Sequence, residues 1–214
     1  MVKPASHPAD GAETRILDAA HAVFLRRGTA GARMQEIAKE ARVNPALLHY
    51  YFRSKARLSE AVFTRAAAQL LPAAFQILGS DRPLEDKVTA IVDHEHAQLL
   101  KTPYLPAYVL SELAHHPERA RQFLSAVTGR TPEEIGRSVM ARLKAQIQEQ
   151  VKAGRMRAIE PDQFVINLMS LCIFPFAART MICTLLGLDA AGFEKFVARR
   201  RKELPASFLR GLRP

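Results

Sequence analysis

The chain has 214 residues, of which 48% are hydrophobic and 24% are charged. This composition is typical of a globular protein with one or two domains and excludes wholesale disorder. Lysine and arginine outnumber aspartate and glutamate by 31 to 21, so the formal net charge is +10, which permits a partner such as nucleic acid or an anionic membrane surface. Two cysteines are too few for a disulfide scaffold and favour a reducing compartment. The first residues lack the apolar core of a signal peptide, and we expect a cytoplasmic protein.

The pattern of apolar and helix-capping residues predicts an all-α chain, because strand-like alternation is nearly absent. Residues 1–11 are expected to form a flexible tail. The first helix is predicted to open with a capping box at Asp10 and to end at Gly28. The second predicted helix covers 34–41, and the third begins at Asn44-Pro45. A long helix is predicted from Ser54 toward Gly79, with a kink at Pro72, and further helices begin near Pro83, Tyr104 and Pro117. Two more run from Thr131 to Gly154 and from Glu160 to Gly187, and the last begins near Asp189.

Positive charge is concentrated toward the N-terminus. Residues 26–57 carry eight basic side chains against Glu36 and Glu40, which gives a net charge of +6. Residues 61–192 are nearly neutral, with 14 basic and 13 acidic groups. This distribution indicates a small unit that faces nucleic acid, followed by a larger neutral unit. The basic run 199–202 is interpreted as a solvated helix end.

The stretch 34–55, MQEIAKEARVNPALLHYYFRSK, predicts a helix, a three-residue turn and a second helix. Ala38 is small where the two helices must cross closely, Val43 is positioned to fill the turn, and Leu48 faces inward from the second helix. This is the pattern of a helix-turn-helix, whose second helix enters the major groove of DNA. The alternative is an amphipathic helical hairpin whose basic residues are merely solvated. It does not explain why the helix cap, the residue that fills the turn, the inward-facing apolar residues and the positive charge all fit a helix-turn-helix.

Several outward-facing residues of this motif are candidates for DNA contact. Leu47 can contact a thymine methyl group, while His49 and Tyr50 can donate to phosphates or bases. Lys55 lies where a phosphate can bind a helix N-terminus. The predicted DNA-contacting residues are Arg33, Gln35, Arg42, Asn44, Pro45, Ala46, Leu47, His49, Tyr50 and Lys55.

Residues 12–65 resemble the TetR family of bacterial transcriptional regulators. The usual family pattern combines an Ile-Ala pair, Ala-Gly-Val-Ser, a Leu-Tyr-x-Tyr/His-Phe run and Ser-Lys. The matching residues of this chain are Ile37-Ala38, Ala41-Arg42-Val43-Asn44, Leu48-His49-Tyr50-Tyr51-Phe52 and Ser54-Lys55.

Three positions depart from the family pattern. Arg42 stands where the turn glycine is usual, and a non-glycine residue in the left-handed region costs about 1–2 kcal/mol, which a phosphate contact would offset. Ala32-Arg33 replaces the usual capping threonine, and because alanine is a poor cap we expect Arg33 to act on phosphate through its charge. His49 replaces the usual phosphate-binding tyrosine and is a shorter, weakly pH-sensitive donor. These departures affect individual phosphate contacts and leave the motif intact.

The resemblance implies a DNA-binding domain over residues 12–58 and a ligand-binding and dimerisation domain over residues 59–214. It also implies a homodimer in which the last two long helices of each subunit form a four-helix interface. The stretch 164–186 carries one charged residue, Arg179, and a helix that is apolar all round needs cover on every side, which a second subunit can supply. A membrane span is the alternative by length, against which Asn167, Pro175 and Arg179 argue. A two-fold dimer places its recognition helices about 34 Å apart and requires a pseudo-palindromic operator.

The predicted helix from Pro83 to Lys101 places Glu95 in the centre of its apolar face, with His96 on the flank. Because a buried carboxylate needs a partner, Glu95 is either a polar anchor in an apolar effector pocket or half of an internal salt bridge, for instance with Arg179. Both interpretations stay open. The candidate ligand-binding residues are Glu95, His96, Tyr104, Tyr108, Phe174 and Arg179, although aromatic residues at helical spacing also suit plain core packing.

No metal site or cofactor is expected, because His94 and His96 lie about 200° apart on a helix and cannot hold one ion. No Ser-His-Asp, Cys-His or glycine-rich phosphate-loop pattern is readable, so an enzyme is not expected. The sequence therefore predicts a dimeric DNA-binding regulator, a repressor that a small apolar or amphipathic effector releases from its operator. The alternatives are a nucleoid-type DNA binder without an effector and a helical enzyme with an accessory helix-turn-helix.

Overall fold

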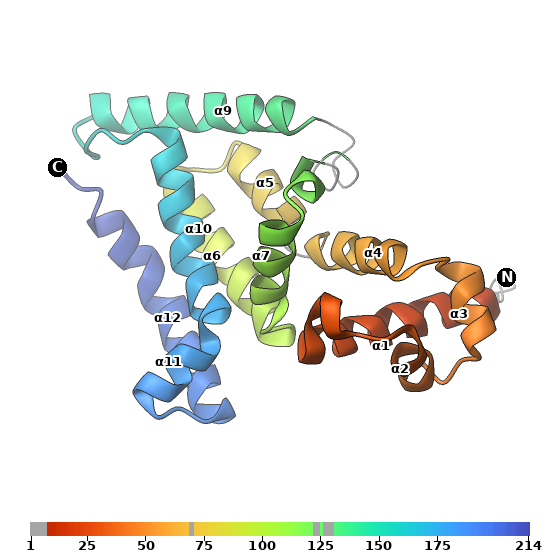
Figure 1. Cartoon of the computed structure of the whole chain (residues 1–214). Helices are drawn as coiled ribbons and strands as arrows, with labels where there is room; N and C mark the ends of the chain where they lie inside the picture. The colour runs from red at the N-terminus through yellow and green to blue at the C-terminus, as the bar shows by residue number, and fades with distance from the viewer. Residues whose placement is uncertain (1–7, 69–70, 122–124, 126–130) are drawn as a thin grey trace, which may run out of the picture. The chain divides into compact units, whose positions relative to one another are not determined.

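The computed structural model describes residues 8–68, 71–121, 125 and 131–214, and these residues form helices and their connections, with no strand among them (Figure 1). The predicted all-α class is therefore confirmed. The chain divides into two compact units, Met1–Ala66 and Ala67–Pro214. This boundary lies after Ala66, later in the chain than residue 58, where the family resemblance places it.

The first unit contains α1 to α4. Its core is apolar, and the side chains of Ile16, Phe24, Ile37, Leu48 and Phe63 are almost fully buried. Ion pairing adds to this core, because Arg65 on α4 pairs with Asp18 on α1. The helices are α1 (Pro8–Gly31), α2 (Met34–Glu40), α3 (Pro45–Tyr51) and α4 (Lys55–Ala67).

The α1 helix departs from its predicted bounds at both ends. It begins at Pro8, so residues 8–11 are helical and do not belong to the expected tail. Proline suits the first turn of a helix because its missing N–H would have no intrahelical partner there, so the predicted start at Asp10 is wrong. Gly28 has φ 67 and ψ 160 and breaks the helix as predicted, but helical structure resumes and continues to Gly31.

The second unit contains the remaining helices. Its core includes Val88, Ile91, Leu143, Phe164 and Leu168, all 0% exposed. The helices are α5 (Leu71–Gly79), α6 (Leu84–Lys101), α7 (Leu105–His115), α9 (Pro132–Lys152), α10 (Pro161–Ala177), α11 (Arg179–Leu186) and α12 (Ala190–Arg210). Residues 118–121, near the predicted start at Pro117, are also helical, and the rest of that predicted helix lies largely outside the described residues.

The α6 helix is the centre of the second unit, since it contacts α5, α10 and α12. The α9 helix lies across α5 and α10 (Figure 1), and α11 lies at the other end of α10. The C-terminal segment is fastened near the start of α10, where the backbone N–H of Arg157 donates to the carbonyl of Leu212 at 2.8 Å.

Three predicted helix starts have side-chain caps, and those at Asn44 and Thr131 are caps that the sequence predicts. Thr131 and Glu134 form a reciprocal capping box at α9. The side chain of Asn44 accepts from the N–H of Ala46 at 2.8 Å, and that of Asp189 accepts from the N–H of Gly192 at 2.7 Å. These are local interactions, which explains why the sequence predicts the three helix starts.

Two helices that the sequence predicts as continuous are broken. The stretch from Ser54 to Gly79 divides into α4 and α5, and Pro72 lies in the first turn of α5 instead of at a mid-helix kink. The stretch from Glu160 to Gly187 divides into α10 and α11, which meet at an angle of 70°.

Pro175 gives a physical reason for the weakness of the helix near the second break. Proline has no N–H, so it cannot donate to the carbonyl of Leu171 four residues earlier. The guanidinium of Arg200 on α12 donates to that carbonyl instead, from Nε at 3.2 Å and from Nη2 at 3.0 Å. A contact from α12 therefore satisfies the backbone group that Pro175 leaves free.

Lys87 is a buried charged residue that the sequence does not single out. Its side chain is 0% exposed, and Nζ donates to the carbonyl of Leu78 at 2.6 Å and to Oε1 of Gln146 at 2.7 Å. Burial lowers the pKa of this ammonium. Because Leu78 lies in the last turn of α5, Lys87 ties α5, α6 and α9 together.

Two stretches are long and apolar enough to cross a membrane by length and composition alone. One is 55–79, which includes residues outside the described set, and the other is the bent pair of α10 and α11. A buried core helix passes the same test, so length and composition do not distinguish the two cases.

Candidate nucleic-acid interface and effector site

The α2 and α3 helices form the predicted helix-turn-helix. Ile37 and Ala38 on α2 and Leu48 on α3 are all at most 2% exposed, and the two helices are in contact. The N–H of Val43 donates to the carbonyl of Ala38 at 3.0 Å and closes the turn. The side chain of Val43 is only half-buried, so its packing and this backbone hydrogen bond both stabilise the turn.

The outward face of α3 is as predicted. Pro45 begins the helix, and Ala46, Leu47, His49 and Tyr50 are all exposed. Tyr50 is 77% exposed and its ring meets that of Tyr51 edge to face, with centroids 5.5 Å apart. Because Leu48 holds the inner side of α3, these outward side chains are available to a groove of DNA.

Arg42 has φ 54, the left-handed conformation that the missing turn glycine requires. Its side chain is exposed. A non-glycine residue pays about 1–2 kcal/mol for this conformation. Among the described residues Arg42 has no ion pair that would offset this cost.

The positive charge of residues 26–57 is partly neutralised within the unit. Arg26 pairs with Glu40 at 3.0 Å, and Arg27 pairs with Glu36 at 3.1 Å. Five exposed cations of this segment make no ion pair with any described residue, so their charge remains available to phosphate. These are Arg33, Lys39, Arg42, Arg53 and Arg57.

Lys39, Arg53 and Arg57 are absent from the DNA-contacting set that the motif predicts. The signal that points to them is the charge of the whole segment, not the family pattern. Gln35 is exposed on α2, and its contact with DNA stays a prediction.

Lys55 has a role in the fold that its sequence position does not reveal. Its ammonium donates to the carbonyl of Ala30 at 2.8 Å and to that of Ala32 at 3.2 Å. These carbonyls lie at and just beyond the end of α1, where backbone acceptors lack helical partners. Lys55 therefore ties the end of α1 to the start of α4, and its contact with phosphate stays a prediction.

Glu95 and His96 on α6 are buried in the second unit, with 1% and 0% of their surface exposed. Among the described residues, Oε1 of Glu95 and both ring nitrogens of His96 have no hydrogen-bond partner. Burial raises the pKa of Glu95 to about 7. Burial, aided by the nearby charges of Arg200 and Arg201, lowers the pKa of His96 to about 4. Both side chains are therefore held toward their neutral forms.

The hypothesised ion pair between Glu95 and Arg179 does not form. Arg179 instead donates from Nη1 to the hydroxyl of Tyr104 at 2.6 Å, and its guanidinium lies 4.9 Å from the ring centroid of Phe193. The guanidinium thus finds an oxygen acceptor and an aromatic face away from Glu95.

The candidate ligand-binding residues are not all brought together in one enclosed space. Tyr104 and Phe174 are 51% and 55% exposed, whereas Glu95, His96 and Tyr108 are buried. One residue of each group is connected by a series of contacts. Ring contacts run from His96 to Phe176 and from Phe176 to Phe193, and the guanidinium of Arg179 lies over the rings of Phe193 and Tyr104. Phe176 and Phe193 are missing from the predicted set.

Comparison with known proteins agrees with the helix-turn-helix. The model of the bacterial regulatory proteins of the tetR family matches residues 16–62. The HTH-type transcriptional repressor SCO4008 of Streptomyces coelicolor is 30% identical over 58% of this chain and 65% of its own length, so this chain spans slightly less than two thirds of that relative. The HTH-type transcriptional repressor NicS of Pseudomonas putida is 26% identical over 86% of this chain and 84% of its own.

The whole chain also shares its fold with solved structures. A bacterial regulatory protein of the tetR family from Rhodococcus RHA1 matches 94% of this chain and 97% of its own with a TM-score of 0.65, at 19% identity. The first unit of this chain is therefore identified as a helix-turn-helix domain of the tetR type, similar to the domains of HTH-type transcriptional repressors.

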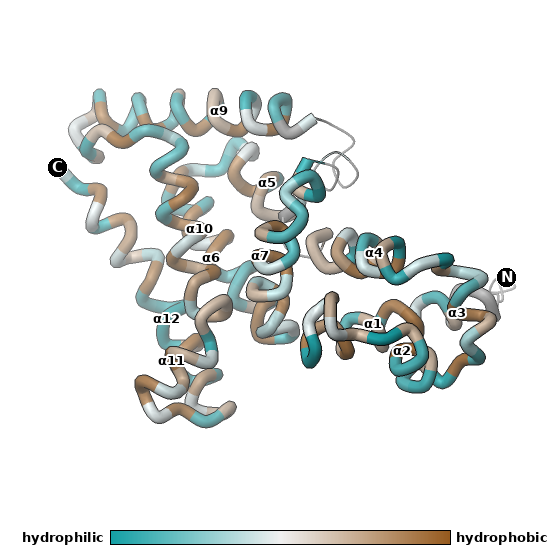
Figure 2. The backbone as a smooth tube through the Cα atoms, in the orientation of Figure 1, coloured by the Kyte–Doolittle hydropathy of each residue, from teal (hydrophilic) through white to brown (hydrophobic). Residues whose placement is uncertain are grey.

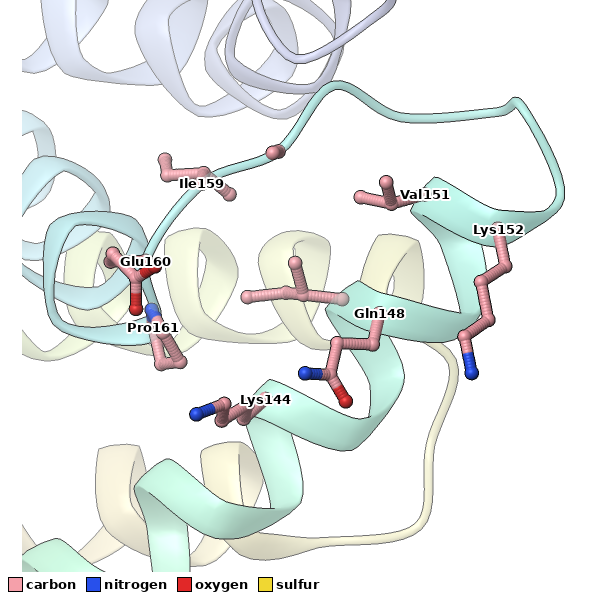
Figure 3. A pocket seen from close by; sticks show the side chains of 9 residues that line it. Lys144, Gln148, Val151, Lys152, Ile159, Glu160 and Pro161 are labelled. Carbon is pink, nitrogen blue, oxygen red and sulfur yellow. The ribbon is translucent and has the colours of Figure 1, made fainter.

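The hollow drawn in Figure 3 lies elsewhere, in the second unit. It has a volume of about 380 Å³ and lies between the end of α9 and residues 158–161, which lead into α10. Its floor is apolar and includes Ile147, while its polar lining residues are exposed side chains: Lys144, Gln148, Lys152 and Glu160. No buried polar group among these residues would orient a ligand.

A second hollow of about 680 Å³ lies along α6 and α12, bordered by the ion pair of Asp93 and Arg201 at 2.5 Å. None of the predicted ligand-binding residues lines either hollow. Among the described residues, no group of three or more His, Cys, Asp and Glu side chains is arranged to hold a metal ion.

Proposed function

We propose that this chain is an effector-responsive repressor of the tetR type that binds a pseudo-palindromic operator as a homodimer. The observation that carries the proposal is the geometry of the first unit. The α3 helix presents an exposed face, and the same unit carries five exposed cations that make no ion pair with any described residue. Phosphate contacts from such cations supply most of the affinity of DNA binding, and the exposed helix supplies the sequence reading.

The α10 and α11 helices support the dimer. The exposed positions of α10 from Gln163 to Phe174 carry no charge, and they include Ile166 at 60% exposed and Phe174 at 55% exposed. The hydrophobic colouring continues into α11 (Figure 2), where Leu185 is 77% exposed. An uncharged, partly apolar helix face of this kind is typical of an interface between identical subunits.

The buried polar pair of Glu95 and His96 supports an effector site in the second unit. Unpartnered polar atoms inside a protein cost free energy, and a ligand that hydrogen-bonds to them recovers it. We expect such a ligand to enter through the ring cluster that ends at Tyr104. A ligand changes operator affinity only as far as it binds the two states of the dimer differently, which is typically 5- to 150-fold.

The test of DNA binding is selection of fragments from the source genome by the purified protein at near-physiological salt, followed by sequencing. Enrichment of one or a few pseudo-palindromes would support a specific regulator, and the adjacent genes would suggest the effector class. Uniform or absent enrichment would contradict it and would favour the nucleoid-type alternative.

The test of the effector site uses the operator found in that selection. Apolar and amphipathic compounds are screened for those that both raise the melting temperature and release the protein from the operator. Phe193→Ala and His96→Gln are expected to weaken the response to an active compound. Unchanged responses in both variants would contradict an effector site at this cluster.

A further inference from the structure

The N-terminal end of α3 is apolar. Pro45, Ala46 and Leu47 are its first three residues, all three are exposed, and Leu47 is 36% exposed. In a helix-turn-helix, the N-terminal residues of the second helix contact the edges of the bases. This exposed apolar surface therefore lies where the sequence of the operator is read.

Hydrogen-bonding side chains that identify a base are absent from this end of α3. Arginine and lysine identify guanine, and asparagine and glutamine identify adenine, each through paired hydrogen bonds. None of these four residue types occurs in Pro45–Tyr51. Asn44 lies directly before the helix, and its Oδ1 accepts from the N–H of Ala46 at 2.8 Å, so this side chain is already engaged in capping α3.

The major groove displays one apolar group, the C5 methyl of thymine. We propose that Ala46 and Leu47 read thymine methyl groups, so that the operator half-site has A·T pairs where the N-terminal end of α3 lies. The inference rests on the proposed operator-binding function and adds the chemical feature that the protein selects. His49 and Tyr50, further along α3, are then available for polar contacts with phosphates or with neighbouring bases.

The size of the effect follows from the burial of one methyl group. Removing a methyl that a protein buries is expected to weaken binding about fourfold. Loss of a whole paired hydrogen-bond contact to a base would cost more than this at one position. We therefore expect modest losses of affinity at several thymines when their methyl groups are removed, and no single guanine whose replacement causes a much larger loss.

The test replaces thymine by uracil, one position at a time, in the operator recovered by genomic selection. This change removes only the C5 methyl. For the unaltered protein we expect about fourfold weaker binding at one or two positions in each half-site and no change at the others. Equal affinity for thymine and uracil at every position would overturn the inference while leaving the operator-binding function in place.

Variants of the protein assign the contact. Leu47→Ala is expected to bind the thymine and uracil operators equally at one of the sensitive positions. Leu25→Ala is the matched control, because Leu25 is also an exposed leucine of the same unit, at 38% exposed, and lies on α1. The control should keep the fourfold difference. A full difference retained by Leu47→Ala would overturn the assignment to Leu47, and failure to recover any operator would overturn the proposed function and this inference together.

Discussion

Two basic residues near the start of α4 allow the stability of the first unit and its affinity for DNA to be tested separately. Lys55 donates to the carbonyls of Ala30 and Ala32, whereas Arg57 is exposed and makes no ion pair with a described residue. Lys55→Met is expected to lower the free energy of unfolding by about 1.5–3 kcal/mol, because two carbonyls lose a charged donor. Urea denaturation measures this loss.

Arg57→Met is the matched variant for DNA binding. It should leave the stability within about 0.5 kcal/mol of the unaltered protein, as surface substitutions usually do. If Arg57 contacts a phosphate, the slope of log affinity against log salt should become shallower by about 0.9. A large stability loss in Arg57→Met, with none in Lys55→Met, would contradict the roles assigned to both residues.

Glu95 and His96 give the second unit opposing pH dependences. The pKa of Glu95 is raised from 4.5 to about 7, so between these values the folded protein binds more protons than the unfolded chain and stability falls as pH rises. The pKa of His96 is lowered from 6.5 to about 4, so between those values the unfolded chain binds more protons and the contribution of His96 to stability rises with pH. The two effects partly cancel between about pH 4.5 and 6.5.

Replacing Glu95 by glutamine removes one of these effects. Relative to the unaltered protein, Glu95→Gln is expected to gain stability from pH 4.5 to pH 7 and then to keep a constant advantage of up to about 3 kcal/mol. Urea denaturation at pH 5, 6, 7 and 8 measures the difference. Glu85→Gln, which removes an exposed carboxylate from the same helix, should show no comparable gain. An advantage that is the same at every pH would contradict a buried, protonated Glu95.

At the scale of helices, the sequence predicts starts better than ends and breaks. The caps at Asn44, Thr131 and Asp189 depend on residues two or three positions away, so the local pattern contains them. Near the break after α10, the carbonyl of Leu171 is satisfied by Arg200, which is 29 positions away and outside any local pattern. The same limit applies to the candidate sites. The outward set on α3 follows from helical periodicity, whereas the partners of Lys55 and Arg179 come from distant parts of the chain.

The contact of Arg200 with α10 can be measured as a coupling with Pro175. Arg200→Met is expected to cost about 1.5 kcal/mol when residue 175 is proline, because the carbonyl of Leu171 then has no donor. In the Pro175→Ala background the same change should cost less, since alanine restores an N–H that can donate to Leu171. A double-mutant cycle by urea denaturation gives the coupling. Arg199→Met is the control and should show no coupling, and equal costs of Arg200→Met in both backgrounds would contradict this explanation.

At the scale of the whole molecule, the two units have complementary tasks. In the proposed function, the first unit binds phosphate with the cations that make no ion pair with a described residue and reads the bases with its exposed α3 helix. The second unit has an uncharged face on α10 and buried polar groups on α6. One recognition helix contacts only half of a pseudo-palindrome, so specific binding requires a second subunit that places its own helix about 34 Å away. Dimerisation through the second unit is therefore the step that would connect an effector to the operator.

The uncharged face of α10 provides the test of this connection. In a two-fold interface each subunit contributes the same surface, so a glutamate at Ile166 introduces a buried charge from both sides. We expect Ile166→Glu to be monomeric by light scattering after gel filtration and to lose specific operator binding, while its helical content is unchanged. Leu110→Glu is the matched control, because Leu110 on α7 is 54% exposed against 60% for Ile166. A monomeric Leu110→Glu variant together with a dimeric Ile166→Glu variant would place the interface on α7 instead of α10.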